Sequence, residues 1–141
     1  MKMKDSKYSQ CLYFTSAALA RKVERLAAAS WKKVDLAPSH AYLLMALLDE
    51  PGIQPSALSN ELHLQPSTIT RLIEKLEEKK LVVRTTEGKI TNVYPTPKAK
   101  AMWPELKACM NQFCQQSSKL LTAEESKRLV HDMAKLADKL D

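Results

Sequence analysis

The sequence predicts a mainly α-helical protein with one small β-hairpin. Apolar residues recur at helical spacing along most of the 141 residues, and two short runs rich in Val, Ile, Thr and Tyr lie at 81–85 and 89–95. The chain has only two glycines, Gly52 and Gly88. So few residues suited to positive φ exclude a multi-turn β-sandwich and a glycine-rich phosphate loop. A chain of this length holds one domain, residues 1–141, with a well-buried core.

The helices are expected in a definite order. A long amphipathic helix covers 6–31, and Ser39 caps a second helix that Pro51-Gly52 ends. Two shorter helices, over 55–62 and 66–80, each have proline in the first turn, where its missing N–H costs nothing.

The remaining elements follow the helix over 66–80. The two β-rich runs flank Thr86-Glu87-Gly88, and this pattern predicts a hairpin. Thr96-Pro97 then starts a long helix that Trp103-Pro104 kinks, and a capping box over 122–125 starts the last helix.

The charge of the chain favours a polyanionic partner. Lys and Arg number 22 and Asp and Glu 16, which gives a formal net charge of +6. Residues 1–60 and 61–100 each carry eight basic and five acidic residues, whereas 101–141 carry six of each. The basic excess therefore belongs to the first two thirds of the chain.

The sequence predicts a cytoplasmic protein that does not interact with membranes. No stretch approaches the roughly 20 apolar residues of a membrane span, and no signal-peptide core follows the N-terminal lysines. The three cysteines, Cys11, Cys109 and Cys114, have no disulfide-like spacing and fit a reducing compartment. The three histidines match no metal spacing, so we expect no metal and no cofactor.

The segment 54–95 carries the functional prediction. Its leucines and isoleucines have the spacing of a short helix, a tight turn and a second helix around one small core. In the second helix the residues expected to face this core are Ile69, Leu72, Ile73 and Leu76. Those left at its N-terminal end or outer face are Gln65, Pro66, Ser67, Thr68, Thr70, Arg71 and Lys75. Hydroxyls, an amide and cations suit hydrogen bonding to base edges and phosphates in a DNA major groove.

A helix-turn-helix followed by a hairpin is a winged helix. Arg84, Lys89 and Asn92 place donors on or beside this wing, where they could reach the DNA backbone or minor groove. The predicted fold is therefore a winged helix-turn-helix flanked by long N- and C-terminal helices. Its predicted function is sequence-specific binding of double-stranded DNA, with the helix over 66–80 in the major groove.

The sequence resembles the MarR family of bacterial transcription regulators. The resemblance runs from about residue 9 to 140, and the segment PSTITRLIEKLEEKKLV looks like the family's recognition helix and its exit. It implies a homodimer on an inverted-repeat operator, with dimerisation helices in 6–34 and 97–141 and the winged helix-turn-helix in 39–96. It also implies that Ser67, Thr68, Thr70 and Arg71 lie at base- and phosphate-contacting positions.

Two departures from the family pattern concern the DNA-binding unit. The family's wing usually carries an Asp-x-Arg turn, whereas TTEGKITN has only Lys89 near its tip. His63 stands where a helix-turn-helix usually has glycine in a left-handed conformation, which histidine adopts at some cost.

The resemblance also implies a response to an effector, either a small aromatic or phenolic ligand or an oxidant. The segment SQCLYFTSAALAR resembles the family's organic-hydroperoxide-sensing branch, which makes Cys11 a candidate redox sensor. The competing interpretation of Cys11 is a small buried hydrophobe in the dimer interface.

Two further functions remain open on the residues alone. One is a winged-helix protein-interaction module that does not bind DNA, because the fold does not dictate its partner. The other is a thiol peroxidase using Cys11, although only Arg21 lies nearby as an activating group. Since no nucleophile, base and orienting group can be proposed together, we expect no enzymatic activity.

Overall fold

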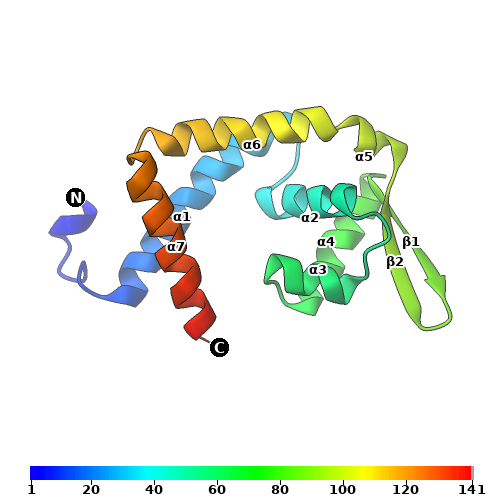
Figure 1. The fold of residues 1–141 in the computed structure, drawn as a ribbon, viewed down its shortest axis with the longest axis horizontal. Coiled ribbons are helices and arrows are strands. Elements are labelled where there is room, and N and C mark those ends of the chain that lie inside the picture. The colour runs from blue at the N-terminus through cyan, green and yellow to red at the C-terminus, as the bar shows by residue number, and fades with distance from the viewer. Residues whose placement is uncertain (141) are drawn as a thin grey trace.

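A computed structural model describes residues 1–140. In these residues the helices are η1 (Met3–Asp5), α1 (Leu12–Trp31), η2 (Lys32–Val34), α2 (Pro38–Asp49), α3 (Pro55–Leu62), α4 (Pro66–Glu78), α5 (Pro97–Ala101), α6 (Trp103–Ser118) and α7 (Ala123–Lys139). An antiparallel hairpin of β1 (Val82–Glu87) and β2 (Ile90–Pro95) lies between α4 and α5. The predicted fold class, mainly α with a small hairpin wing, is confirmed (Figure 1). Within 1–140 no helix has the length and apolar character needed to cross a membrane.

The molecule has two ends joined by α6. Figure 1 shows α6 running along one side, with α1 and α7 towards one end and α2, α3, α4 and the hairpin at the other. Because α6 packs on both α1 and α2, it connects the two ends.

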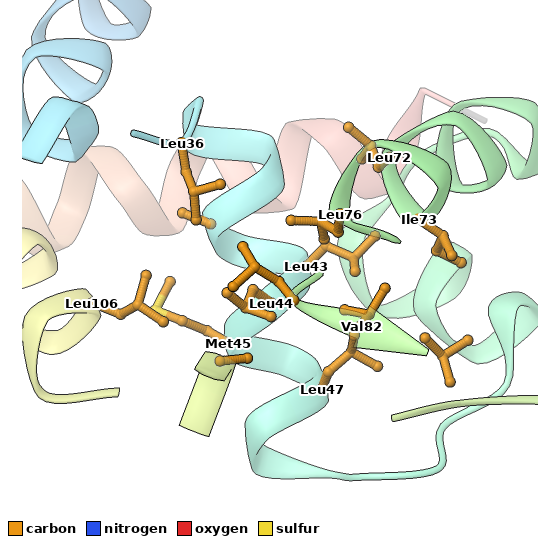
Figure 2. Packing of buried hydrophobic residues seen from close by; sticks show 14 of the residues in the cluster. Leu36, Leu43, Leu44, Met45, Leu47, Leu72, Ile73, Leu76, Val82 and Leu106 are labelled. Carbon is orange, nitrogen blue, oxygen red and sulfur yellow. The ribbon is translucent and has the colours of Figure 1, made fainter. Parts of the chain in front are cut away.

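Helix α2 is the centre of the core. It contacts α1, α3, α4, α6 and β2, and its Leu43, Leu44 and Leu47 are fully buried. Figure 2 shows Leu106 of α6 on one side of α2 and Leu76 of α4 on the other. The near-continuous apolar surface of α2 is therefore used to hold the hairpin and the helix pair against the rest of the chain.

The first helix starts later than the sequence predicts. Residues 6–10 form turns, in which the Tyr8 N–H bonds to the Ser6 hydroxyl at 3.2 Å and the Thr15 hydroxyl donates to the Ser9 carbonyl at 3.1 Å. Cys11 has extended backbone and precedes α1. Local bonds between hydroxyl side chains and the backbone, made here by Ser6 and Thr15, compete with helix formation, and the helix begins at Leu12.

The start of α2 corrects a second prediction. Its N-cap is Ala37 and Pro38 occupies the first turn, so Ser39, the expected cap, is already inside the helix. Proline has a preset helical φ and no N–H to satisfy, which makes it a helix starter even where a serine follows.

Helix α4 ends at Glu78, two residues before the expected end. Lys80 has a left-handed backbone with φ of 61°, and the Leu81 N–H bonds back to the Leu76 carbonyl at 2.9 Å. This left-handed residue reverses the chain into β1 and closes the end of α4.

β1 extends further towards the turn than expected, and the turn is tighter. The register pairs Val82 with Pro95 and Glu87 with Ile90, so the strands extend almost to Gly88. The base of the hairpin is joined to the segment after α2, because the Gly52 N–H donates to the Val93 carbonyl at 2.8 Å. Val82 and Val93 are buried there, whereas residues 83–90 are exposed.

Two predicted helix starts after the hairpin are confirmed. The Thr96 hydroxyl accepts from the Ala99 N–H at the start of α5, and α6 begins at Trp103 after a break at Met102. The capping box that starts α7 is complete, with Thr122 and Glu125 each accepting the other's backbone N–H at 3.1 Å.

Candidate nucleic-acid interface

Helix α4 has one buried face and one polar face. The four residues expected to face the core, Ile69, Leu72, Ile73 and Leu76, are all buried. The exposed residues of α4 are Pro66, Ser67, Thr70, Arg71, Glu74, Lys75 and Glu78, and Thr68 is half-buried. The predicted contact residues between 66 and 75 therefore lie together on one helix, the element whose width fits a major groove.

The Thr70 hydroxyl makes a hydrogen bond within its own helix. It donates to the Pro66 carbonyl at 3.1 Å, which leaves the oxygen free to accept a further hydrogen bond. An acceptor at this position suits the exocyclic amino groups of adenine or cytosine.

The N-terminal end of α4 is presented to solvent. Gln65 caps the helix through its backbone carbonyl, which accepts from the N–H groups of Thr68 and Ile69, both at 3.0 Å. Its side chain makes no capping bond. The Gln65 amide is therefore available to an outside partner beside the positive end of the helix dipole.

The turn between α3 and α4 has the geometry expected of a helix-turn-helix. His63 is left-handed with φ of 53°, as predicted for this position. The Ser59 hydroxyl donates to the Leu64 carbonyl and the Leu64 N–H donates back to the Ser59 carbonyl. These paired bonds fix the angle at which α4 leaves the turn.

The cations of this surface differ in their surroundings. Arg71 is exposed and forms no ion pair within the described residues, whereas Lys75 Nζ lies 3.6 Å from Glu78 Oε2 with both side chains largely exposed. Lys89 is exposed in the turn of the hairpin. Arg84 is instead paired with Glu77 of α4, with Arg84 Nη2 2.7 Å from Glu77 Oε1.

The sequence interpretation missed a polar cluster that joins α4 to the segment after α1. Lys79 Nζ lies 2.9 Å from the Asp35 carbonyl and 3.2 Å from its carboxylate, while Lys98 Nζ donates to the Lys79 carbonyl at 3.2 Å. Asp35 and Lys79 are 44 residues apart, and no local pattern connects them. The left-handed backbone of Asp35, with φ of 55°, was likewise not predicted.

A pocket lies between η2 and α6. Its volume is about 290 Å³, and it is lined by Lys33, Val34, Glu105, Ala108, Cys109 and Gln112. Burial raises the pKa of the Cys109 thiol, which the positive charge of Lys33 partly offsets. The pocket lining thus combines a thiol, a cation and a carboxylate.

The cysteines lie in three different environments. Cys109 is buried in the core, whereas Cys114 is exposed on α6. Cys11 is exposed in the single chain at the start of α1. Both interpretations of Cys11, as sensor and as interface residue, therefore stay predictions. Within 1–140, no three His, Cys, Asp or Glu side chains form a group able to hold a metal ion.

These features define the class of protein. A helix pair with a fixed turn, a polar outer face on the second helix and a hairpin directly after it make a winged helix-turn-helix.

Comparison with known proteins agrees with this class. Residues 34–89 match the model of the MarR family. The HTH-type transcriptional repressor MdtR of Bacillus subtilis is 25% identical over 123 residues, which cover 85% of this chain and 79% of that protein. Over residues 34–89 the chain is therefore similar to the MarR family of transcription regulators.

Solved structures share the whole fold at lower identity. The repressor CouR bound to a 23-mer DNA duplex has a TM-score of 0.84 at 20% identity, covering 97% of this chain and 98% of that one. The S. aureus MepR–DNA complex has a TM-score of 0.80 at 16% identity, covering 92% and 98%. The organohalide-sensing regulator RdhR in its 2,4-dichlorophenol-bound form has a TM-score of 0.84 at 17% identity, covering 99% and 85%.

Proposed function

We propose that this chain acts as a homodimer that binds an inverted-repeat operator in double-stranded DNA, with α4 of each subunit in a major groove. The observation that carries this proposal is the division of α4, which buries its apolar residues and exposes hydroxyls and Arg71, a cation with no ion pair among residues 1–140. The outer face of α4 has no large apolar side chain of the kind that anchors protein–protein interfaces. This composition favours DNA over the alternative of a protein-interaction module.

The proposed contacts divide into two kinds. Base edges and nearby phosphates would be contacted by Gln65, Ser67, Thr68, Thr70 and Arg71. Pro66 would place the start of the helix against the DNA. Lys75 and Lys89 would contact phosphates, because flexible, solvated ammonium groups neutralise backbone charge without reading sequence.

The proposed dimer uses the end of the molecule opposite the wing. No residue of α7 is buried in the described single chain, yet Leu129, Val130, Met133 and Leu136 are apolar and lie at helical spacing. Helix α1 likewise exposes Leu19 and Val23. Apolar stripes on two terminal helices support dimerisation through 6–34 and 97–141, with 39–96 as the DNA-binding unit.

We propose that the effector is a small aromatic or phenolic ligand or an oxidant. A pocket of about 290 Å³ beside α6 lies next to the connection between the two ends of the molecule, where an occupant could alter their relative position. The solved RdhR relative holds a chlorinated phenol. A shift in operator affinity with a phenol, or with an organic hydroperoxide in wild type but not in Cys11→Ser, would separate the two kinds of effector.

The primary test is a binding titration with duplexes selected by the wild-type protein from a random library. Arg71→Ala should weaken binding by about 1–3 kcal/mol, the range for loss of a good base contact. Lys119→Ala, which removes an equal charge from the distant α6–α7 junction, is the control and should bind like wild type. If the wild type selects no duplex and shows no salt-dependent binding, the proposed function is wrong.

A further inference from the structure

The outer part of the wing has little to hold it in place. Its base is anchored by the buried Val82 and Val93 and by the Gly52–Val93 hydrogen bond. Beyond this base, residues 83–90 are all exposed. A two-stranded hairpin without a covering layer is only marginally stable in water, so its direction needs a further restraint.

Arg84 lies directly across from the buried Val93 in the register, and it provides a contact between α4 and the inner end of the exposed part of the wing. It follows Val82 by two residues in β1, so both side chains lie on the same face of the hairpin. The guanidinium reaches the Glu77 carboxylate, with 2.7 Å between Arg84 Nη2 and Glu77 Oε1. Both side chains are only about one third exposed, at 37% and 31%. A charge-assisted pair with this partial shielding is more restrictive than a fully solvated one.

The Glu77 end of the pair is itself fixed. Its backbone carbonyl accepts the N–H of Lys80, the left-handed residue that ends α4. The Lys80 carbonyl in turn accepts the Thr96 hydroxyl at 2.9 Å, which joins this corner to the end of β2. The ion pair therefore connects the inner end of the exposed part of the wing to the last turn of α4.

Building on the proposed DNA-binding function, we infer that the Glu77–Arg84 pair is a strut that sets the angle between the wing and α4. Arg84 is accordingly a positioning residue that stays on Glu77 in the DNA complex. Lys89 is then the cation through which the wing meets DNA, and its contact is to phosphate rather than to base edges.

The strut is tested first without DNA, by hydrogen exchange of the hairpin amides followed by mass spectrometry. Glu77→Gln and Arg84→Gln should each speed exchange over 83–92 about two- to fivefold, the range that an ion pair of this exposure supports. Glu78→Gln is the matched control, because it removes the neighbouring carboxylate, which pairs with Lys75 and not with the wing. The exchanged pair Glu77→Arg with Arg84→Glu should return exchange towards wild type. Unchanged exchange in both single variants would overturn the strut.

The second arm measures binding to a duplex selected by the wild type. Glu77→Gln should bind about two- to fivefold more weakly than Glu78→Gln, with the same dependence on salt, because no phosphate contact is lost. Lys89→Gln should instead lower the slope of log affinity against log salt by about 0.9. Tighter binding and a steeper slope in Glu77→Gln would show that a released Arg84 contacts phosphate, and would overturn the positioning role.

The two arms separate this inference from the proposed function. Faster exchange in the variants of a protein that binds no duplex would support the strut and reject DNA binding. Normal wild-type binding with no change in either variant would reject the strut and leave DNA binding in place.

Discussion

The pKa of His40 in the core helix is affected by lysine charges at the end of the candidate DNA-binding helix. His40 lies on α2, and its buried Nδ1 has no hydrogen-bond partner among the described residues. Burial lowers the pKa of the imidazole, and the positive charges of Lys79 and then Lys75 lower it further. The folded protein therefore binds a proton at His40 less readily than the unfolded chain does.

This lowered pKa predicts the sign of a pH dependence. The unfolded chain binds the proton more tightly than the folded one, so the free energy of unfolding should fall as pH drops through the usual histidine pKa of 6.5. Urea unfolding at several values between about pH 5 and pH 8 would measure it. His40→Gln should flatten this dependence, whereas His131→Gln, on the exposed α7, should retain it. Equal slopes in His40→Gln and wild type would contradict the expectation.

Positive backbone φ at two non-glycine residues was predictable to different degrees. The position of His63 in a helix-turn-helix indicates a left-handed residue, and the structure has one there. Lys80 also adopts this conformation, yet the sequence interpretation continued the helix through it. Lysine is a good helix former, so its local propensity does not reveal that β1 must turn back at this point to bury Val82.

At the scale of elements, Thr96 joins the end of α4 to α5. Its hydroxyl donates to the Lys80 carbonyl at 2.9 Å beyond the end of α4 and accepts the Ala99 N–H at 3.3 Å at the start of α5. One side chain thus satisfies backbone groups at two helix ends.

Thr96→Ala should destabilise the protein by about 1–2 kcal/mol, since it removes an N-cap and leaves the Lys80 carbonyl without this donor. Thr96→Ser keeps the hydroxyl and should recover most of the loss. Chemical denaturation of both variants measures the difference. Similar losses in both would show that the threonine methyl, rather than the hydroxyl, carries the stability.

At the scale of the whole molecule, the two ends differ in how far they bury their apolar residues. The winged helix-turn-helix buries its apolar faces within one chain, around α2. The opposite end leaves apolar side chains of α1 and α7 exposed, among them Met133 at 45% and Leu136 at 39%. An exposed stripe of this kind is stable in water when a second copy covers it.

Met133→Glu should therefore weaken the proposed dimer at least tenfold without unfolding the chain, because it buries a charge in the interface while leaving the core unchanged. Sedimentation velocity over a concentration series would measure the dissociation constant, and operator binding should weaken with it. Lys135→Gln makes the same change in net charge on the opposite side of α7 and is the control. A monomeric wild type, or an unchanged dimer in Met133→Glu, would contradict dimerisation through α7.

The sequence by itself determined the order of elements, the buried face of α4 and most helix starts. Apolar spacing, prolines in first turns and capping residues act within a few positions along the chain, so they can be read locally. Only the tertiary structure decided that Arg84 pairs with Glu77 and that Lys79 meets Asp35, because such partners are chosen by how helices and hairpin pack around α2. The local sequence showed that Arg84 is a cation on the wing, and packing directed its charge towards α4.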